Sequence, residues 1–286
     1  MDRWIQTSVI LTASAIFCLV NHASAQSQRD QSGEVTQLSP GEQAGEEWIN
    51  SHGMAFCWCP PGSYLAGSPA KEPGRYADET QRRVVIDEGF WIGKFEVTKG
   101  QWTGSPIRNC LAVEDDHPQD NASCTKDAAR ALKALNELEA KLGALPPEWE
   151  YALPTEEQWE YAARAGAATR FYFGDDVNDL PKHANFSDRS YYETLDVYSN
   201  AAHRTLNDRF ASLAPVGSFA ANPWGLHDVY GNLAEWCDNC VARGGSWATS
   251  AENCRSAYRH PFGDRDTEQF IGFRFVIRRK QPERLR

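Results

Sequence analysis

The chain has 286 residues, of which 41% are hydrophobic and 12% aromatic, enough for one large core or two small ones. Its formal net charge at pH 7 is −10. An acidic chain is repelled by nucleic acid and by anionic membrane surfaces, so the composition favours neither as a partner.

The first 25 residues are typical of a secretory signal peptide. A short basic start at Arg3 precedes an apolar stretch over residues 8–20, which is too short to span a bilayer. Small residues at positions 23–25 supply a cleavage site. We therefore expect an exported protein, periplasmic or secreted, that begins near Gln26 and has no membrane span.

The exported part is expected to consist of a linker and one domain. Residues 26–46 are rich in Gln, Ser, Gly and Glu, a composition that predicts a disordered linker. Structure is expected to begin near Trp48, and nothing further along the chain demands a second domain. We therefore assign residues 47–286 to a single domain.

Strand patterns open this domain and two helices follow. Residues 54–68 and 82–97 each predict two strands around a turn. For the first helix, Thr125 is the expected cap and Gly143 the expected stop. Its predicted apolar stripe consists of Leu132, Leu135, Leu138 and Leu142.

The second helix has a stronger start signal. Thr155 and Gln158 form a T-x-x-Q capping box, and the helix is expected to stop at Gly166. Beyond Gly166 the chain is rich in turns, aromatic residues and short apolar runs.

Export makes disulfides the default state of the cysteines. Removal of Cys18 with the signal peptide leaves an odd number, so at least one thiol stays free. Cys110 and Cys124 bracket a polar loop and are expected to close it. Cys237 and Cys240 form a C-x-x-C, but without the strand leading into a helix that a thioredoxin-type site needs.

Several sequence blocks occur in an order that points to one family. They are PPGSYLAGS, RRVVIDEGFWIGKFEVTKGQW, LPTEEQWEYAARAG, NPWGLHDVYGNLAEW, RGGSW and GFRFV. In this order they cover nearly all of residues 48–278 and resemble the formylglycine-generating enzyme (sulfatase-modifying factor) family. The resemblance implies a C-type-lectin-like α+β fold that is loop-rich and low in regular secondary structure.

The resemblance also implies two structural calcium sites made of loop oxygens, which suit the irregular coordination of calcium. The first consists of Asn185, Phe186, Asp208 and Phe210. The second consists of Asp228, Gly231, Leu233 and Glu235. A longer insert between Phe186 and Asp208 departs from the family pattern and weakens the first site. The alternative is that these acidic residues only cap turns.

Copper chemistry is not expected. Copper-dependent members of the family carry a cysteine pair just after RGGS, whereas this chain has Thr249 at the first position and Cys254 five residues later. A hard threonine hydroxyl cannot replace a thiolate on Cu(I). Cys254 is therefore either a small buried hydrophobic residue or a thiol activated by Arg255 or Arg259. No organic-cofactor motif is present.

A branch of the family that matures the fluorophore of the siderophore pyoverdine agrees with this chain in export, length and the missing cysteine pair. The resemblance thus implies an oxidoreductase that uses oxygen to oxidise a peptide-like metabolite, a dihydropyoverdine-type precursor. The iron-dependent branch of the family does not fit, because its histidine ligands come from an added helical domain and the sequence of this chain shows no such domain.

We expect the active groove to lie around the RGGSW block. The predicted catalytic residues are Glu252, Cys254, Tyr258, Arg259 and His260. The predicted substrate-binding residues are Trp236, Ser246 and Trp247. Two alternatives stay open: a divergent sulfatase activator that forms formylglycine, and a catalytically inactive, calcium-binding, lectin-like scaffold.

Overall fold

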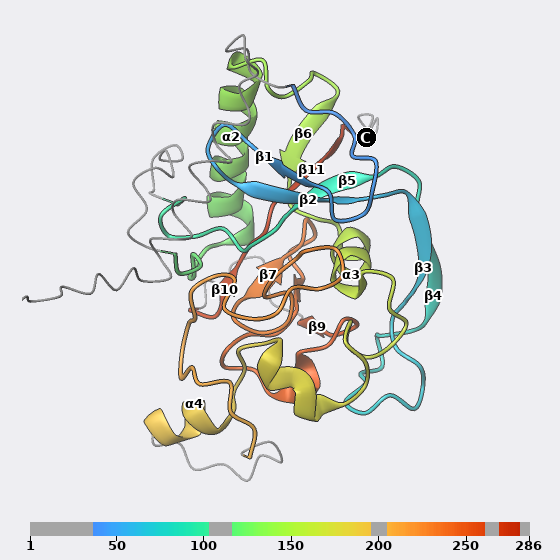
Figure 1. Cartoon of the computed structure of the whole chain (residues 1–286), viewed down its shortest axis with the longest axis vertical. Helices are drawn as coiled ribbons and strands as arrows, with labels where there is room; N and C mark the ends of the chain where they lie inside the picture. Colours follow the sequence, from blue (N-terminus) through green and yellow to red (C-terminus); the bar gives the residue numbers. More distant parts are fainter. Residues whose placement is uncertain (1–36, 103–115, 196–204, 261–268, 281–286) are drawn as a thin grey trace, which may run out of the picture.

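The computed structural model describes residues 37–102, 116–195, 205–260 and 269–280. Three sheets and a few short helices occupy these ranges, and most of the remaining residues lie in turns and irregular loops (Figure 1). The predicted signal peptide and Cys110 lie outside the described residues. None of the described helices is both long and apolar enough to cross a membrane.

The largest sheet has five strands in the order β1-β2-β5-β11-β6, all antiparallel. Its strands are β1 (Glu47–Ile49), β2 (Ala55–Cys59), β5 (Phe90–Gly93), β6 (Trp149–Ala152) and β11 (Val276–Arg279). The last strand of the chain, β11, is inserted between β5 and β6, with Val276 opposite both Ile92 and Ala152. The two ends of the domain are thereby joined in one sheet.

Two smaller sheets complete the strand structure. The hairpin of β3 (Gly62–Ala66) and β4 (Arg82–Ile86) lies at the right of Figure 1. The second sheet has the order β10-β7-β8-β9. Its strands are β7 (Ala234–Trp236), β8 (Ala242–Arg243), β9 (Arg259–His260) and β10 (Ile271–Gly272). It therefore brings the sequence blocks at AEW, RGG and YRH together.

The five-stranded sheet is covered on both faces because its buried strands carry apolar side chains in both directions. In β2, Phe56 and Trp58 face a core shared with α2 (Ala129–Lys141). Cys57 and Cys59, on the opposite face, enter a second core shared with α3 (Glu156–Arg164). The third helix, α4 (Arg189–Thr194), buries none of its residues.

The helix starts differ in how well the sequence predicted them. The Thr155 capping box at α3 is confirmed, with both reciprocal hydrogen bonds present. The predicted cap at Thr125 is wrong: Ser123 accepts from the N–H groups of Lys126 and Asp127 and begins a π-helical turn that leads into α2. The hydroxyl group two residues earlier is therefore the cap.

The buried face of α2 also departs from the predicted leucine stripe. Ala131, Leu135 and Glu139 point into the protein, whereas Leu142 is 48% exposed. Helix α2 ends at Lys141 and is followed by Gly143 at a φ of 74°, close to the predicted stop.

Residues 37–46 are ordered, unlike the predicted linker. Leu38 is buried and its N–H donates to the carbonyl of Ala144, while Gly41 lies so close to Trp58 that a Cβ would clash. Burial against aromatic residues offsets the polar composition of this segment. The folded part thus includes at least ten residues before position 47.

The predicted Cys110–Cys124 disulfide is corrected by the structure. Cys124 is bonded to Cys240, 116 positions away along the chain. Cys57, Cys59, Cys237 and Cys254 are free and buried. The bond joins the start of the α2 region to the turn after β7, two segments that only the tertiary fold brings together.

Candidate functional site

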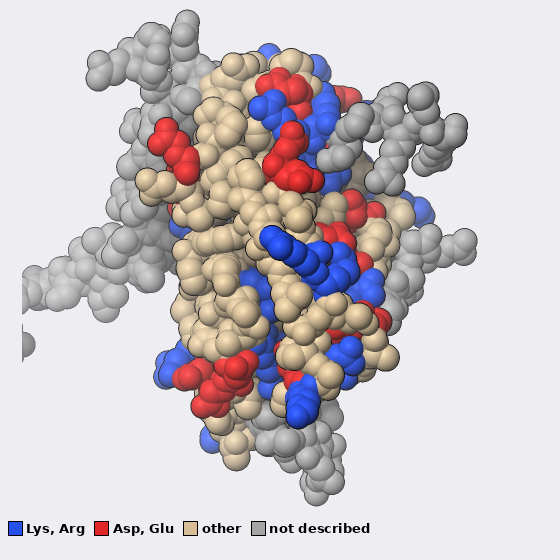
Figure 2. Space-filling view, turned by 90° about the vertical axis from the view of Figure 1, so that its right-hand side faces the viewer, with Lys and Arg blue, Asp and Glu red and all other residues tan. Residues whose placement is uncertain are grey.

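A charged cleft of about 170 Å³ opens between the β3–β4 hairpin, the start of α3, and strands β8 and β9. Its exposed rim is formed by Asp78, Arg82 and Glu157, and its floor includes Glu160 and Arg243. On the face of the molecule seen in Figure 2, acidic and basic side chains are interspersed rather than separated into patches. The cleft thus offers groups of both signs.

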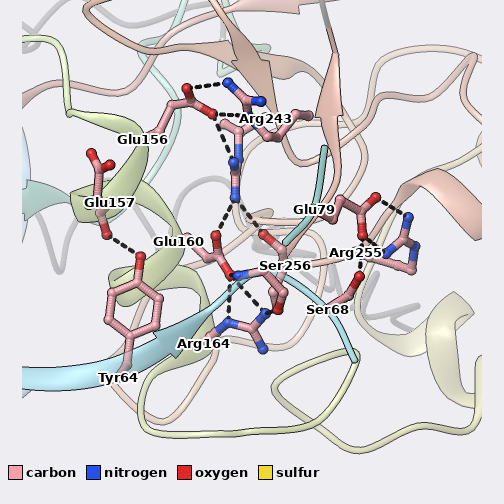
Figure 3. A network of polar contacts seen from close by, with 12 residues as sticks. Tyr64, Ser68, Glu79, Glu156, Glu157, Glu160, Arg164, Arg243, Arg255 and Ser256 are labelled. Carbon is pink, nitrogen blue, oxygen red and sulfur yellow. Dashed lines mark hydrogen bonds and ion pairs between the residues drawn. The ribbon is translucent and has the colours of Figure 1, made fainter. Parts of the chain in front are cut away.

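The floor of the cleft is an ion-pair network around Arg243 (Figure 3). The Arg243 guanidinium is almost fully enclosed and donates to Glu156 Oε2 at 3.0 Å and to Glu160 Oε2 at 2.8 Å. Arg164 donates to the other oxygen of Glu160 at 2.8 Å. Each buried charge in this network therefore has a partner, as its burial requires.

Arg259 is the predicted catalytic residue that lines the cleft. It donates from Nε and Nη2 to the two oxygens of Glu156, at 2.5 and 2.7 Å, and from Nη1 to Asp78 at 3.1 Å. Burial alone would raise the pKa of Glu156, but the hydrogen bonds from Arg259 and Asn239, together with nearby charges, lower that pKa to about 2. Glu156 is consequently ionised across the physiological range.

The RGGSW loop and the residues just after it hold a pair of hydroxyl groups, Ser246 and Thr249. Ser246 is fully buried, and its Oγ lies 2.8 Å from Oγ1 of Thr249. Cys254 is also fully enclosed, and burial raises the pKa of its thiol. This environment favours the interpretation of Cys254 as a small buried hydrophobic residue over an activated thiol.

The other predicted catalytic residues surround this loop without forming one constellation. Tyr258 is 6% exposed and burial raises the pKa of its hydroxyl. His260 is half-buried on β9, and its ring lies edge-on to Tyr258 at a centroid distance of 5.9 Å. Glu252 lies in a short 3₁₀ turn, and its backbone carbonyl accepts a hydrogen bond from Arg255.

The two predicted tryptophan platforms have different surroundings. Trp236 is fully buried and its Nε1 donates to the carbonyl of Ala122 at 2.8 Å, so it is a core residue and no ligand can stack on it. Trp247 is half-buried and lies 5.8 Å from the ring of Tyr191. Of the two, only Trp247 remains suitable for contacting a ligand.

Residues of the first predicted calcium site lie together. Asp208 accepts from the backbone N–H groups of Phe186 and Phe210, both at 2.8 Å, and burial raises its pKa to about 7. Asn185 donates to Asn232, but its own Oδ1 is enclosed and has no hydrogen-bond partner among the described residues. An unpaired buried oxygen of this kind fits a cation ligand.

Only some residues of the second predicted calcium site have an oxygen left to bind a cation. Oδ2 of Asp228 accepts from Gly217, and its enclosed Oδ1 has no partner in the described parts of the chain. Glu235 instead binds Arg274 at 2.7 Å and Trp159 at 2.7 Å, which occupies both carboxylate oxygens. Gly231 packs so tightly that a Cβ would lie 1.9 Å from the Asn185 carbonyl oxygen.

A third buried carboxylate, Glu96, was missed by the sequence reasoning. It is 1% exposed and accepts from the Leu233 N–H and from Asn232. Burial, followed by the charges of Asp228 and Glu235, raises its pKa. The sequence signal for this residue is its place between the hydrophobic residues Phe95 and Val97 in FEVT. Within the described ranges, no three His, Cys, Asp or Glu side chains gather as a metal-ligand group.

The mixed, loop-rich α+β fold agrees with the predicted class, and comparison with known proteins identifies the family. A family model described as the sulfatase-modifying factor enzyme 1-like domain matches residues 46–279. The chain therefore belongs to the formylglycine-generating enzyme (sulfatase-modifying factor) family. Both the family and the fold predicted from the sequence are confirmed.

Individual relatives are similar over different lengths. Formylglycine-generating enzyme from Thermomonospora curvata is 37% identical over 86 residues, which are 30% of this chain and 26% of that protein. The inactive Cα-formylglycine-generating enzyme 2 of Mus musculus is 32% identical over 111 residues, 35% of this chain and 32% of that protein. The chain thus spans about a quarter to a third of these relatives.

Among solved structures, PvdO from Pseudomonas aeruginosa superposes with a TM-score of 0.65 at 24% sequence identity. The match covers 83% of this chain and 99% of PvdO. The likeness establishes a common fold over nearly the whole of that protein.

Proposed function

We propose that this protein is an exported oxidative-maturation enzyme that acts on a peptide-like metabolite, specifically a dihydropyoverdine-type siderophore precursor. The family and the near-complete coverage of PvdO support this proposal. The similarity to formylglycine-generating enzymes covers only a fraction of those proteins.

The observation that carries the proposal is the Ser246–Thr249 hydroxyl pair. By the sequence resemblance, Thr249 of this pair stands at the first cysteine position of copper-dependent members, and Cys254 is enclosed. Two soft sulfur ligands are the minimum for a linear Cu(I) site. These residues therefore favour an oxidation in which no copper–dithiolate centre takes part, and they disfavour the sulfatase-activator alternative.

In this proposal the charged cleft binds the substrate. Asp78, Arg82 and Glu157 have side chains between 37% and 56% exposed, so they offer hydrogen-bond donors and acceptors to a peptide-like ligand. His260 follows Arg259 on β9 without being one of the residues that line the cleft, and burial lowers the pKa of its imidazole, which favours the neutral form at pH 7. We assign to His260 the role of proton acceptor.

The reaction removes two hydrogens from the reduced ring. One proton goes to His260, a second proton goes to solvent, and two electrons pass to dioxygen, which takes up two protons in return, one released by His260 and one from solvent. The products are the aromatic ring and hydrogen peroxide, so atoms and electrons balance with dioxygen as the oxidant.

Mass spectrometry of the secreted metabolites of an iron-starved host tests the function. A strain that lacks the gene for this protein is expected to accumulate a siderophore two hydrogens heavier. Return of the intact gene is expected to restore the mature product. A His260→Asn variant should lose this restoration, whereas His117→Asn, at an exposed loop residue, should retain it. An unchanged siderophore profile in the deletion strain overturns the proposal.

We also propose export and bound structural calcium. Export predicts that protein recovered from the periplasm begins near Gln26, which N-terminal sequencing checks. The unpaired Oδ1 atoms of Asn185 and Asp228 support calcium as a structural ligand of their loops. Elemental analysis of the purified protein should find calcium, and substitution of either residue by Ala should reduce the amount bound.

A non-catalytic binding role is the second candidate, and one observation favours it. Cys254 and Tyr258 are enclosed, and Arg259 is fully engaged by Glu156 and Asp78. One relative, the mouse protein, is itself described as inactive. This role predicts that His260→Asn leaves every metabolite unchanged, as does deletion of the gene.

A further inference from the structure

Arg170 is a buried arginine whose charge lacks a partner. It is 7% exposed and its guanidinium lies over the ring of Phe171, with Cζ 4.9 Å from the ring centroid. Its Nε and Nη2 are both enclosed, and neither has a hydrogen-bond partner in the part of the chain that the structure describes. Buried cations are normally paired.

The two unpaired nitrogens define one edge of the guanidinium. The N–H groups of Nε and Nη2 point in the same direction, which makes this edge suited to a carboxylate. In Arg164 it holds Glu160 Oε1 at 2.9 and 2.8 Å, and in Arg274 it holds Glu235 Oε1 at 3.1 and 2.7 Å. Arg170 presents the same edge, and no acidic side chain in the described ranges offers an acceptor oxygen to it.

Two carboxylates of this region, those of Glu72 and Glu79, are committed to another arginine. Glu72 and Glu79 bind Arg255 at 2.7–2.8 Å, and Arg255 also donates to the carbonyls of Gly74 and Glu252. Glu72 and Glu252 act on Arg170 only through electrostatic attraction at longer range.

The surroundings of Arg170 reinforce the need for an anion. Burial first, and then the positive charge of Arg255, lower the pKa of Arg170. Cys254 lies close enough for its thiol to respond to both arginines, and Ser256 donates to the backbone carbonyl of Arg170. Arg170 thus lies beside the segment that follows RGGSW.

We propose that the Nε/Nη2 edge of Arg170 binds the carboxylate of a small ligand next to Cys254. A planar carboxylate supplies both missing hydrogen-bond acceptors and neutralises the buried charge. The site is separate from the charged cleft, and no step of the proposed oxidation uses Arg170. The carboxylate belongs either to a free small acid or to the end of a peptide-like ligand.

Thermal unfolding at pH 7.5 and constant ionic strength, with sodium formate replacing sodium chloride, tests this site. Formate should raise the Tm of the full mature protein in a saturable way, because a ligand of the native state shifts the unfolding equilibrium. Arg170→Met should abolish the rise. Arg170→Lys, which keeps the charge but not the two-nitrogen edge, should weaken the apparent formate affinity at least about tenfold.

The matched control is Arg189→Gln, at an exposed arginine paired with Glu193, which should respond to formate like the unmodified protein. N-acetylglycine distinguishes the two sources of the carboxylate: an equal response assigns the end of a larger ligand, and a response to formate alone assigns a free small acid. The proposal is overturned if neither compound changes the Tm of the unmodified protein.

Discussion

Cys254 shows how strongly surroundings control a residue that has lost its family partner. Its thiol is enclosed in an apolar core, so the charged thiolate is disfavoured in spite of the nearby arginines. The same chemical group would be reactive only if the loop exposed it. Burial therefore outweighs the favourable charge of Arg170 and Arg255 at this position.

We predict that iodoacetamide at pH 8 leaves Cys254 unmodified in the native protein and modifies it after unfolding in urea. Peptide mass spectrometry measures the fraction modified at this residue. Disulfide-bonded Cys240 serves as an internal control, since it should resist alkylation in both states until a reductant is added. Rapid modification of native Cys254 would show that the thiol is accessible.

Glu156 links residue chemistry to the acid stability of the fold. Its folded pKa of about 2 lies below the ordinary value of 4.5 for a glutamate, so its stabilising contribution is present above pH 4.5 and is lost as the pH falls towards 2. The shift corresponds to about 3 kcal/mol at most. We expect Glu156→Gln to lower the free energy of unfolding at pH 6 and to have little effect near pH 2.

Urea unfolding of both proteins at several pH values measures this difference. Glu148→Gln is the control, because this half-exposed carboxylate makes only a surface ion pair with Arg279. If the stability difference between the unmodified protein and Glu156→Gln stays constant from pH 6 to pH 2, the lowered pKa of Glu156 is contradicted.

At the scale of elements, α3 and the disulfide show opposite degrees of local control. The start of α3 is set by Thr155 and Gln158, three positions apart, so local sequence was sufficient to predict it. The Cys124–Cys240 bond joins segments separated by 116 positions. Spacing along the chain favoured the nearer Cys110, and only the packing of α2 against β7 brings the true partners together.

Removing that bond by the double substitution Cys124→Ser and Cys240→Ser should destabilise the protein by about 2–5 kcal/mol, because the open chain regains conformational entropy when unfolded. Urea unfolding of oxidised protein gives the value. The single substitution Cys237→Ser is the comparison, since Cys237 is a free thiol. Equal stability of the double variant and the unmodified protein would show that the bond contributes nothing.

At the scale of the whole molecule, the protein depends on buried polar groups as much as on its apolar cores. Three buried carboxylates, Glu96, Asp228 and Glu235, share Arg274 as their nearby cation. The loops that carry them also hold Asn185 through its link to Asn232. A bound cation would therefore stabilise much of the loop-rich half of the fold.

Chelation of calcium is predicted to lower the Tm by about 5–10 °C, as expected for loss of a tightly bound ligand from a domain of this size. Calorimetry with EGTA, followed by calcium or magnesium in excess, measures the effect. Calcium should restore the Tm and magnesium should not, because magnesium requires a more regular oxygen geometry. An unchanged Tm in EGTA would contradict calcium stabilisation.

The sequence by itself determined the family, the fold class and the α3 capping box, because these depend on ordered motifs and on residues a few positions apart. It grouped Arg259, which lines the charged cleft, with the core residues Cys254 and Trp236 as parts of one predicted site. Tertiary structure decided those environments. Burial, charge pairing and disulfide partners depend on contacts between distant segments, and such contacts alone left Arg170 enclosed without a carboxylate.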